Sequence, residues 1–193
     1  MTTNQLNDDD GALLIALARN TLEVKLTGSA EPMDTGKMIH THPGLKRHAG
    51  TFVTLTRNGQ LRGCIGNLTA TESIAQGVRD NVLNAAFHDH RFKPLTRTEL
   101  GEIHIEVSIL SEPSPLSFRD GDDLISKLRP HVDGVILRKG PNGATFLPQV
   151  WEQLPEAMDF LTHLCRKAGL PGDAWTRPGI EISTYQVQYF EEE

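Results

Sequence analysis

The sequence predicts an α+β fold, with a mainly antiparallel sheet and flanking helices. Two β-rich runs are each divided by an Asn-Gly pair, at residues 58–59 and 142–143, and this pair between such runs is a strong hairpin signal. A third run, residues 102–110, alternates apolar and polar side chains as a half-buried antiparallel strand does. Helices and strands alternate too irregularly for repeated β-α-β units, so a parallel sheet is not expected.

The N-terminal segment predicts an amphipathic helix over residues 8–26. Acidic residues precede its apolar stripe and Gly28 follows it, which suits the two ends of a helix. The stripe has the spacing of one helix face and contains Leu13, Leu14, Leu17, Ala18, Thr21 and Leu22. Residues 27–48 hold two prolines and three glycines, and we expect a long loop there.

The first hairpin, residues 50–66, ends in the segment LRGCIG at 61–66. Side chains alternate between the two faces of a strand. One face is then expected to carry Leu61, Gly63 and Ile65, and the other Arg62, Cys64 and Gly66. The guanidinium of Arg62 and the thiol of Cys64 are therefore predicted to lie on the same face.

Residues 69–92 predict a second helix, with Thr71 as its N-cap and Pro94 as its stop. Its apolar stripe consists of Ile74, Ala75, Val78, Val82 and Ala85. The strand at 102–110 follows, and its inward-facing residues are expected to be Ile103, Ile105, Val107 and Ile109.

The C-terminal part predicts a short helix at 121–129, capped by Asp120 or Asp122, and then the second hairpin. A helical stretch follows at 148–168, and Pro155 divides it in two. The longer piece is expected to present one apolar side made of Met158, Leu161, Leu164, Cys165 and Ala168. The last predicted strand, 181–192, places on one face Ser183, Tyr185, Val187 and Tyr189.

The chain has 193 residues, of which 38% are hydrophobic and 23% are charged. This is the composition of a globular protein, and the length suits one large domain or two intimate lobes. We expect a cytoplasmic protein with reduced thiols, because only Cys64 and Cys165 occur and the first residues are polar and acidic. No apolar stretch is long enough to span a bilayer, so no membrane association is expected.

The formal net charge is −6, and the basic residues are dispersed along the chain. Proteins that coat nucleic acids need a basic surface to displace counterions from phosphates, so this balance disfavours that class. The sequence contains none of the glycine-rich phosphate loops, dinucleotide fingerprints or nucleophile-elbow motifs of common nucleotide-binding proteins and hydrolases.

Several of these segments together resemble the AMMECR domain family, also called AmmeMemoRadiSam system protein A. The resemblance covers nearly the whole chain and rests on GTFVTL and LRGCIG at 50–66, AAFHDHRFKPLTRTEL at 85–100, IEVSIL at 105–110, DGVIL at 133–137 and TFLPQVW at 145–151. It implies one α+β domain over residues 1–193, with a larger and a smaller lobe and a cleft near RGCIG. It implies a Memo-like protein and a radical-SAM enzyme as partners. No cofactor is predicted.

The same resemblance implies a ligand-binding cleft. Its expected residues are Arg62, Gly63, Cys64, Ile65, Gly66, Asp89, Arg91 and Asp133, and the family pattern continues through Phe92, Pro94 and Leu95. His88 and His90 lie outside that pattern. Asp133 stands where some relatives have histidine, so a Cys–His pair built on that position would lack its base here.

Cys64 has two interpretations. A nucleophilic or redox thiol needs a lowered pKa, for which Arg62 would supply positive charge, while the neighbouring glycines would let a ligand approach the backbone. A structural cysteine would instead be a small buried hydrophobe, with the glycines marking close packing. Cys165 lies on the apolar side of a predicted helix and is expected in the core.

Asp89 and Arg91 also have two interpretations. They would either tie a loop down through a charge-assisted pair or bind a carboxylate or phosphate ligand. The two His-x-His patterns, 40–42 and 88–90, fall in expected loops or junctions, and no metal site is predicted there.

Three functions follow from these observations. The first is an accessory or ligand-binding protein that acts through the LRGCIG cleft on a small molecule or peptide. The second is a cysteine-dependent enzyme that uses Cys64, with Arg62 as anion partner and His131 or Asp133 nearby. The third is an adaptor for RNA or for nucleic-acid modification, which the acidic charge disfavours. The sequence leaves open whether the protein is an enzyme.

Overall fold

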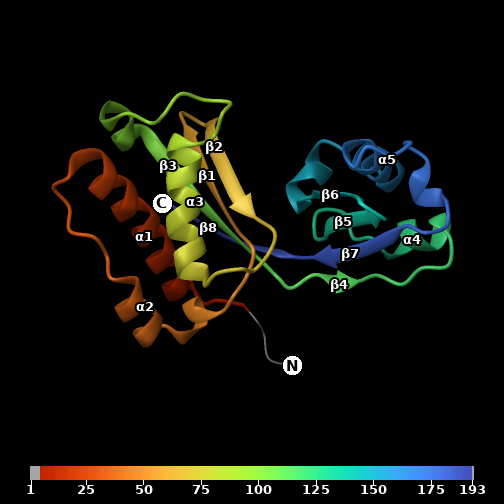
Figure 1. The fold of residues 1–193 in the computed structure, drawn as a ribbon, viewed down its shortest axis with the longest axis horizontal. Coiled ribbons are helices and arrows are strands. Elements are labelled where there is room, and N and C mark those ends of the chain that lie inside the picture. The colour runs from red at the N-terminus through yellow and green to blue at the C-terminus, as the bar shows by residue number, and fades with distance from the viewer. Residues whose placement is uncertain (1–4, 193) are drawn as a thin grey trace. The chain divides into compact units, whose positions relative to one another are not determined.

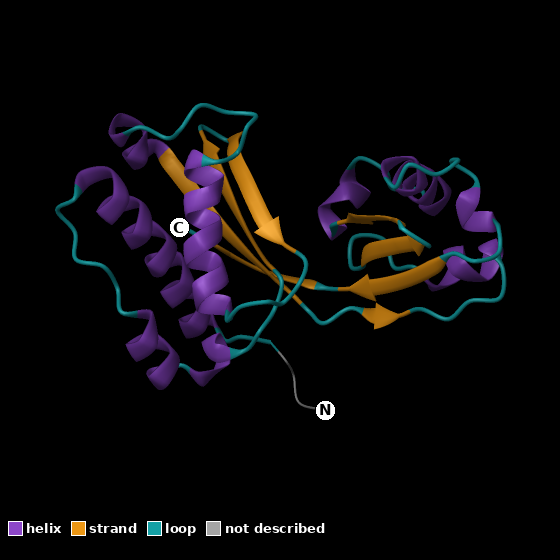
Figure 2. Cartoon of the chain, in the orientation of Figure 1, coloured by secondary structure: helices purple, strands orange, loops and turns teal. Residues whose placement is uncertain are grey.

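A computed structural model describes residues 5–192 of the chain (Figure 1). Helices combine with two sheets whose strands pair antiparallel, so the predicted α+β class is confirmed (Figure 2). The chain divides into two compact units: unit 1 is Met1–Leu110 with Gln188–Glu193, and unit 2 is Ser111–Val187. That the two units form one domain with intimate lobes stays a prediction. Within the described residues, no helix has the length and apolar character needed to cross a bilayer.

Unit 1 is a sheet with helices packed on one of its faces. Its strands are β1 (Thr51–Arg57), β2 (Gln60–Asn67), β3 (Ile103–Leu110) and β8 (Val187–Glu191), in the order β2-β1-β3-β8. The two longer helices, α1 (Asp8–Thr27) and α3 (Ile74–Phe87), contact each other and the sheet. β2 is therefore an edge strand, and α3 lies over it and over β1.

The predicted elements of unit 1 have clear local causes. α1 begins at the side chain of Asn7 and ends at Gly28, whose φ of 68° only glycine adopts readily. Asn58 and Gly59 have φ values of 51° and 74°, as a tight hairpin turn requires, so the first predicted hairpin is confirmed. The predicted N-cap Thr71 is wrong, because the side chain of Ser73 accepts the hydrogen bond from the Gln76 amide.

The segment 27–48 differs from the expected long loop. It contains α2 (Thr35–Thr41) and a 3₁₀ helix, η1 (Pro43–Lys46). The side chain of Asp34 accepts hydrogen bonds from the first amides of α2, and the buried Met38 anchors the helix to the core. A helix of seven residues with one buried side chain has no repeating apolar pattern, so periodicity in the sequence could not predict it.

Unit 2 is a smaller sheet with its own core. Its strands are β4 (Ser114–Pro115), β5 (Gly134–Lys139), β6 (Asn142–Phe146) and β7 (Glu181–Tyr185), in the order β4-β7-β5-β6. Its helices are α4 (Gly121–Lys127) and α5 (Ala157–Lys167), with 3₁₀ helices η3 (Pro148–Glu152) and η4 (Ala174–Thr176). At the centre, the Trp151 ring stacks on Phe160 with ring centroids 3.7 Å apart. Cys165 is fully buried in the same core, as predicted.

Three details of unit 2 differ from the predictions. The second hairpin turns at Gly140, whose φ is 57°, and Pro141, so Asn142 already belongs to β6. The predicted strand 181–192 is two strands, because Tyr185 ends β7 in one sheet and Val187 begins β8 in the other. Met158 is 58% exposed, so it does not line the apolar side of α5.

Candidate functional site

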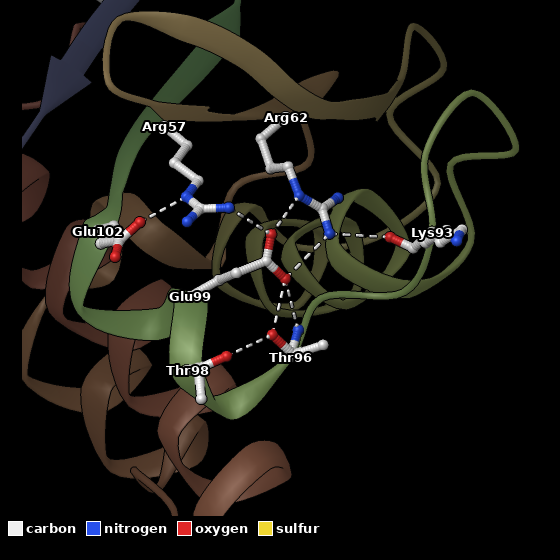
Figure 3. A network of polar contacts seen from close by, with 7 residues as sticks. All are labelled: Arg57, Arg62, Lys93, Thr96, Thr98, Glu99 and Glu102. Atoms are coloured by element: carbon white, nitrogen blue, oxygen red, sulfur yellow. Dashed lines mark hydrogen bonds and ion pairs between the residues drawn. The ribbon is translucent and has the colours of Figure 1, made fainter.

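A β-bulge falls within the LRGCIG segment of β2. Leu55 on β1 pairs with Gly63, but the next residue, Thr56, pairs with Leu61, so Arg62 is an extra residue in the strand. The predicted common face of Arg62 and Cys64 is therefore wrong, because it assumed unbroken alternation. Arg62 turns instead to the same side as Arg57, as Figure 3 shows.

Arg62 is held by a carboxylate that it shares with a second arginine (Figure 3). Its Nε and Nη2 atoms donate to the two carboxylate oxygens of Glu99, at 2.9 and 3.3 Å, and Nη2 also donates to the Lys93 carbonyl. Arg57 donates to the same Glu99 and to Glu102. We call these five residues with Thr96 the Glu99 cluster. The Arg62 side chain is only 13% exposed, so this cation is committed to the protein's own carboxylate.

Glu99 is itself fixed by the start of the 3₁₀ helix η2 (Arg97–Glu102). Its carboxylate accepts hydrogen bonds from the amide and the hydroxyl of Thr96, which forms a capping box. Arg62 is the largest influence on the Glu99 carboxyl, and it lowers the pKa from 4.5 to about 2 although burial acts in the opposite direction. The cluster thus joins the start of β2 to the segment that leads into β3.

Cys64 lies at a second, separate arrangement along the outer edge of β2. Its amide donates to Asp89 Oδ2 at 2.9 Å, and its carbonyl accepts from Arg91 Nη2 at 3.3 Å. Arg91 also donates hydrogen bonds to both carboxylate oxygens of Asp89, at 2.9 and 2.7 Å, so the three residues are connected in a ring. We call these three residues the Cys64 clamp. The Asp89 and Arg91 side chains thus form the hydrogen bonds that a neighbouring strand would otherwise make with the backbone of Cys64.

The electrostatics of the clamp match this geometry. The Asp89 side chain is only 2% exposed, and the Arg91 guanidinium holds the pKa of its carboxyl well below the usual range. Phe92 lies beside both cations, with the guanidinium carbons of Arg62 and Arg91 at 5.9 and 5.5 Å from the ring centroid. Of the two roles predicted for Asp89 and Arg91, these contacts fit the structural role, in which the charged pair holds the chain in place.

The Cys64 thiol is half-buried and points away from the α3 side of the sheet. Its sulfur accepts a hydrogen bond from Thr54 Oγ1 at 3.4 Å. Thr54 is the cross-strand partner of Cys64 on β2 and of Glu106 on β3, so the three side chains form one row across the sheet. Burial raises the pKa of Glu106. The row offers a thiol, a hydroxyl and a carboxyl to whatever contacts this face.

The glycines of the motif are explained by packing. A Cβ added to Gly63 would come under 3.0 Å from the backbone oxygen of Ala85 in α3, and one added to Gly66 would meet the Phe52 ring and a backbone oxygen of β1 as closely. Ile65, between them, packs against the hydrophobic core. These positions let α3 and β1 approach β2 and do not leave open space for a ligand.

Asp133, the remaining predicted site residue, belongs to unit 2. Its carboxylate accepts hydrogen bonds from the backbone and the guanidinium of Arg129, at 3.0 and 2.6 Å, and its carbonyl accepts from the Trp151 ring nitrogen. His131 lies in the same turn, with a φ of 64°. Asp133 is 2% exposed, so its side chain closes this turn.

The histidines of the two His-x-His patterns have separate surroundings. His42 pairs with Asp10, and His88 with Asn84 on the preceding turn of α3. Among residues 5–192 no group of three or more histidine, cysteine or acidic side chains is placed to hold a metal ion.

Sequence reasoning missed Thr54 and Glu99. The pattern Thr96-x-x-Glu99 is a capping-box signature, so the position of Glu99 at a helix start could have been found. Its pairing with Arg62 could not, since 37 residues separate the two and the bulge decides where Arg62 points.

Acid should remove the contribution of Glu99 to stability over a defined pH interval. Because its pKa is lower in the folded than in the unfolded state, the charged carboxylate stabilises the fold above about pH 4.5, and this is lost as the pH falls towards about 2. The shift corresponds to about 3 kcal/mol at most. We expect the unfolding free energy, followed by circular dichroism, to decline more steeply over this interval in the wild type than in Glu99→Gln. Parallel pH profiles would contradict the proposed role of this ion pair.

Comparison with known proteins gives a consistent result. The chain matches the family model described as AMMECR1 over residues 15–190. The crystal structure of an uncharacterized protein from Pyrococcus horikoshii is similar with a TM-score of 0.82 and 31% identity, over 97% of this chain and 94% of that one. Proteins from Methanosarcina barkeri and Methanothermobacter thermautotrophicus are 36% and 35% identical, over 97% of this chain and 92% and 97% of their own lengths. These relatives indicate the fold and the family of the chain, and their names state no activity.

Proposed function

Because the chain belongs to the AMMECR1 family, we propose that it is an accessory or ligand-binding protein whose binding surface includes the Cys64 thiol. The partners we propose are a Memo-like protein and a radical-SAM enzyme in the cytoplasm, the role of an AmmeMemoRadiSam system protein A. The ligand would contact the row formed by Cys64, Thr54 and Glu106, on the face of the sheet away from α3.

The observation that carries this proposal is the Cys64 clamp. The amide and carbonyl of Cys64 are both held by side chains, so the strand cannot shift along its free edge, yet the thiol stays half-exposed. A binding surface needs side chains whose positions are fixed before the ligand arrives. The clamp fixes the backbone that carries the thiol and leaves the thiol itself available.

A covalent role for Cys64 has less support. The sulfur is hydrogen-bonded by Thr54, a neutral hydroxyl that cannot accept a proton as a histidine would. Arg62, the expected anion partner, is bound by Glu99, and the charge of Arg91 is balanced by Asp89. A cysteine-dependent enzyme is the alternative, with Arg91 as the cation beside the thiol.

Two substitutions at one position separate the two functions. Purified protein would be titrated calorimetrically with the Memo-like and radical-SAM proteins encoded in the same genome, and native mass spectrometry would detect any small molecule that it carries. We expect Cys64→Ser to keep the binding of the wild type, and Cys64→Phe to abolish it by filling the surface. A folded Cys64→Ser variant without binding would favour the covalent alternative. Wild-type protein that binds neither partner and no small molecule would overturn the proposal.

Thiol labelling tests whether Cys64 is accessible, and the chain supplies its own control. We expect a maleimide to modify Cys64 in the native protein and Cys165 only after denaturation, because Cys165 is fully buried and burial raises the pKa of its thiol. Peptide mass spectrometry would assign the label. A Cys64 that reacts only in denaturant would contradict an exposed binding thiol.

A further inference from the structure

A small cavity of about 170 Å³ lies on unit 1, between α1, α3 and the segment after α1. Its wall is largely apolar and includes Val24 from α1, Met33 from the connecting segment and Leu83 from α3. None of the residues of the Cys64 clamp or of the Glu99 cluster lines it. The cavity is thus independent of the function proposed above.

The wall of this cavity is fixed by one amide side chain. Asn20 Nδ2 donates to the Glu31 carbonyl at 2.9 Å, and Asn20 Oδ1 accepts from the Met33 amide at 2.8 Å. Both halves of the amide are used, so the segment at Met33 is held against α1 as part of the fold. A wall held in this way is formed before any ligand enters.

The charge at the cavity has one sign. Lys25 from the last turn of α1 and Arg79 from α3 both line it, and no acidic side chain is among its described lining residues. Arg79 is half-buried and Lys25 is exposed. Two cations beside a small apolar wall favour an anion that carries an apolar body.

We propose that this cavity binds a small monocarboxylate with an aromatic ring or a branched chain. A cavity of about 150 Å³ is known to hold one benzene ring, so this one has the size for a single ring or a short branched chain. The apolar body would contact Val24 and Leu83, and the carboxylate would meet Arg79 and Lys25. A bare inorganic anion would leave the apolar wall in water, and a neutral hydrocarbon would leave the cations without a partner.

The test uses benzoate as the probe, with benzyl alcohol as its neutral counterpart. Isotope-labelled full-length protein would be titrated at constant ionic strength and followed by amide shifts in nuclear magnetic resonance. We expect benzoate to shift the amides of Val24, Met33 and Leu83 with a saturable millimolar affinity, and to bind more tightly than benzyl alcohol. Shifts scattered over the surface, or none at these three residues, would overturn the proposal.

Variants separate the charge from the apolar wall. Arg79→Gln should weaken benzoate binding about fivefold or more and leave benzyl alcohol unaffected. Arg97→Gln, which removes an exposed arginine outside the cavity, is the matched control and should change neither. Leu83→Trp should block both ligands, and Val24→Phe serves the same purpose if the tryptophan variant does not fold. Equal benzoate affinity in wild type and Arg79→Gln would overturn the assignment of a carboxylate ligand.

Discussion

Replacing Glu99 by alanine is expected to destabilise unit 1 by about 3 to 5 kcal/mol. Glu99 is the carboxylate that Arg62 binds through two nitrogens, and Arg57 shares it. The Arg62 side chain is 13% exposed, and its Nη1 atom is buried without a hydrogen-bond partner even in the wild type. Without Glu99, the buried guanidinium of Arg62 would keep its hydrogen bond to the Lys93 carbonyl but lose its counter-charge. Leaving one charge of a buried ion pair uncompensated costs more stability than replacing both partners.

The measurement can distinguish the two units. Both tryptophans, Trp151 and Trp175, lie in unit 2, so their fluorescence reports that unit, while circular dichroism reports both. In a urea titration Glu99→Ala should lower the midpoint of the phase seen by circular dichroism and leave the fluorescence midpoint in place, if the units unfold separately. Coincident midpoints that fall together would show instead that the units unfold as one.

Glu102→Ala is the matched control for Glu99→Ala. Glu102 binds Arg57 as well, but it is 48% exposed and its partner keeps Glu99. We expect a change within about 1 kcal/mol, as for other exposed ion pairs. Equal losses in the two variants would mean that the burial of Arg62 has no energetic consequence, and the Glu99 cluster would then be an ordinary surface network.

The fold was largely predictable because its signals are local. The turn at Asn58-Gly59, the glycine that ends α1 and the alternation in the first half of β3 each lie within a few residues, and all are found in the structure. The errors also have a local origin. The sequence offers Gly140-Pro141 and Asn142-Gly143 as competing turns, and the first wins because glycine can adopt the positive φ while proline fits the next position.

The candidate site was predictable only in its residue types. Cys64, Asp89 and Arg91 were all singled out, but nothing local shows that the last two bind the backbone of the first, 25 and 27 residues earlier. The bulge at Arg62 was equally hidden, because an extra residue in a strand leaves no mark in an alternating pattern. Because of this one extra residue, the guanidinium of Arg62 binds the Glu99 carboxylate and does not lie beside the Cys64 thiol.

These contacts give a structural role to every residue of the LRGCIG segment except Leu61, which is 44% exposed, and Cys64. Arg62 joins β2 to η2, Ile65 packs in the core, and the glycines admit α3 and β1. The fold does not require the thiol of Cys64, since the backbone of this residue and not its sulfur is held by the clamp. Function at this segment should therefore be sought in the thiol, while substitutions of Arg62, Ile65 and the two glycines should act on stability.

Gly63→Ala is the strongest test of that division. The added methyl would lie under 3.0 Å from the Ala85 carbonyl oxygen, which belongs to the backbone of α3 and cannot rotate away as a side chain would. Either α3 or the edge strand must shift, and with it the fixed position of Cys64. We expect a loss of about 3 kcal/mol or more, at the upper end of the range for overpacked cores.

Gly101→Ala is the control for this substitution. A Cβ at Gly101 meets nothing within 4 Å, so the same chemical change in the 3₁₀ helix η2 should be neutral or slightly stabilising. Circular dichroism during the urea titration would follow both units and tryptophan fluorescence unit 2 alone, so a loss confined to unit 1 can be identified. If Gly63→Ala is as stable as the wild type, α3 does not rest on β2 as closely as the structure has it, and the glycine must then be explained by a ligand. If it is destabilised and Gly101→Ala is not, the glycine is there for the helix, and the search for a ligand narrows to the sulfur beside it.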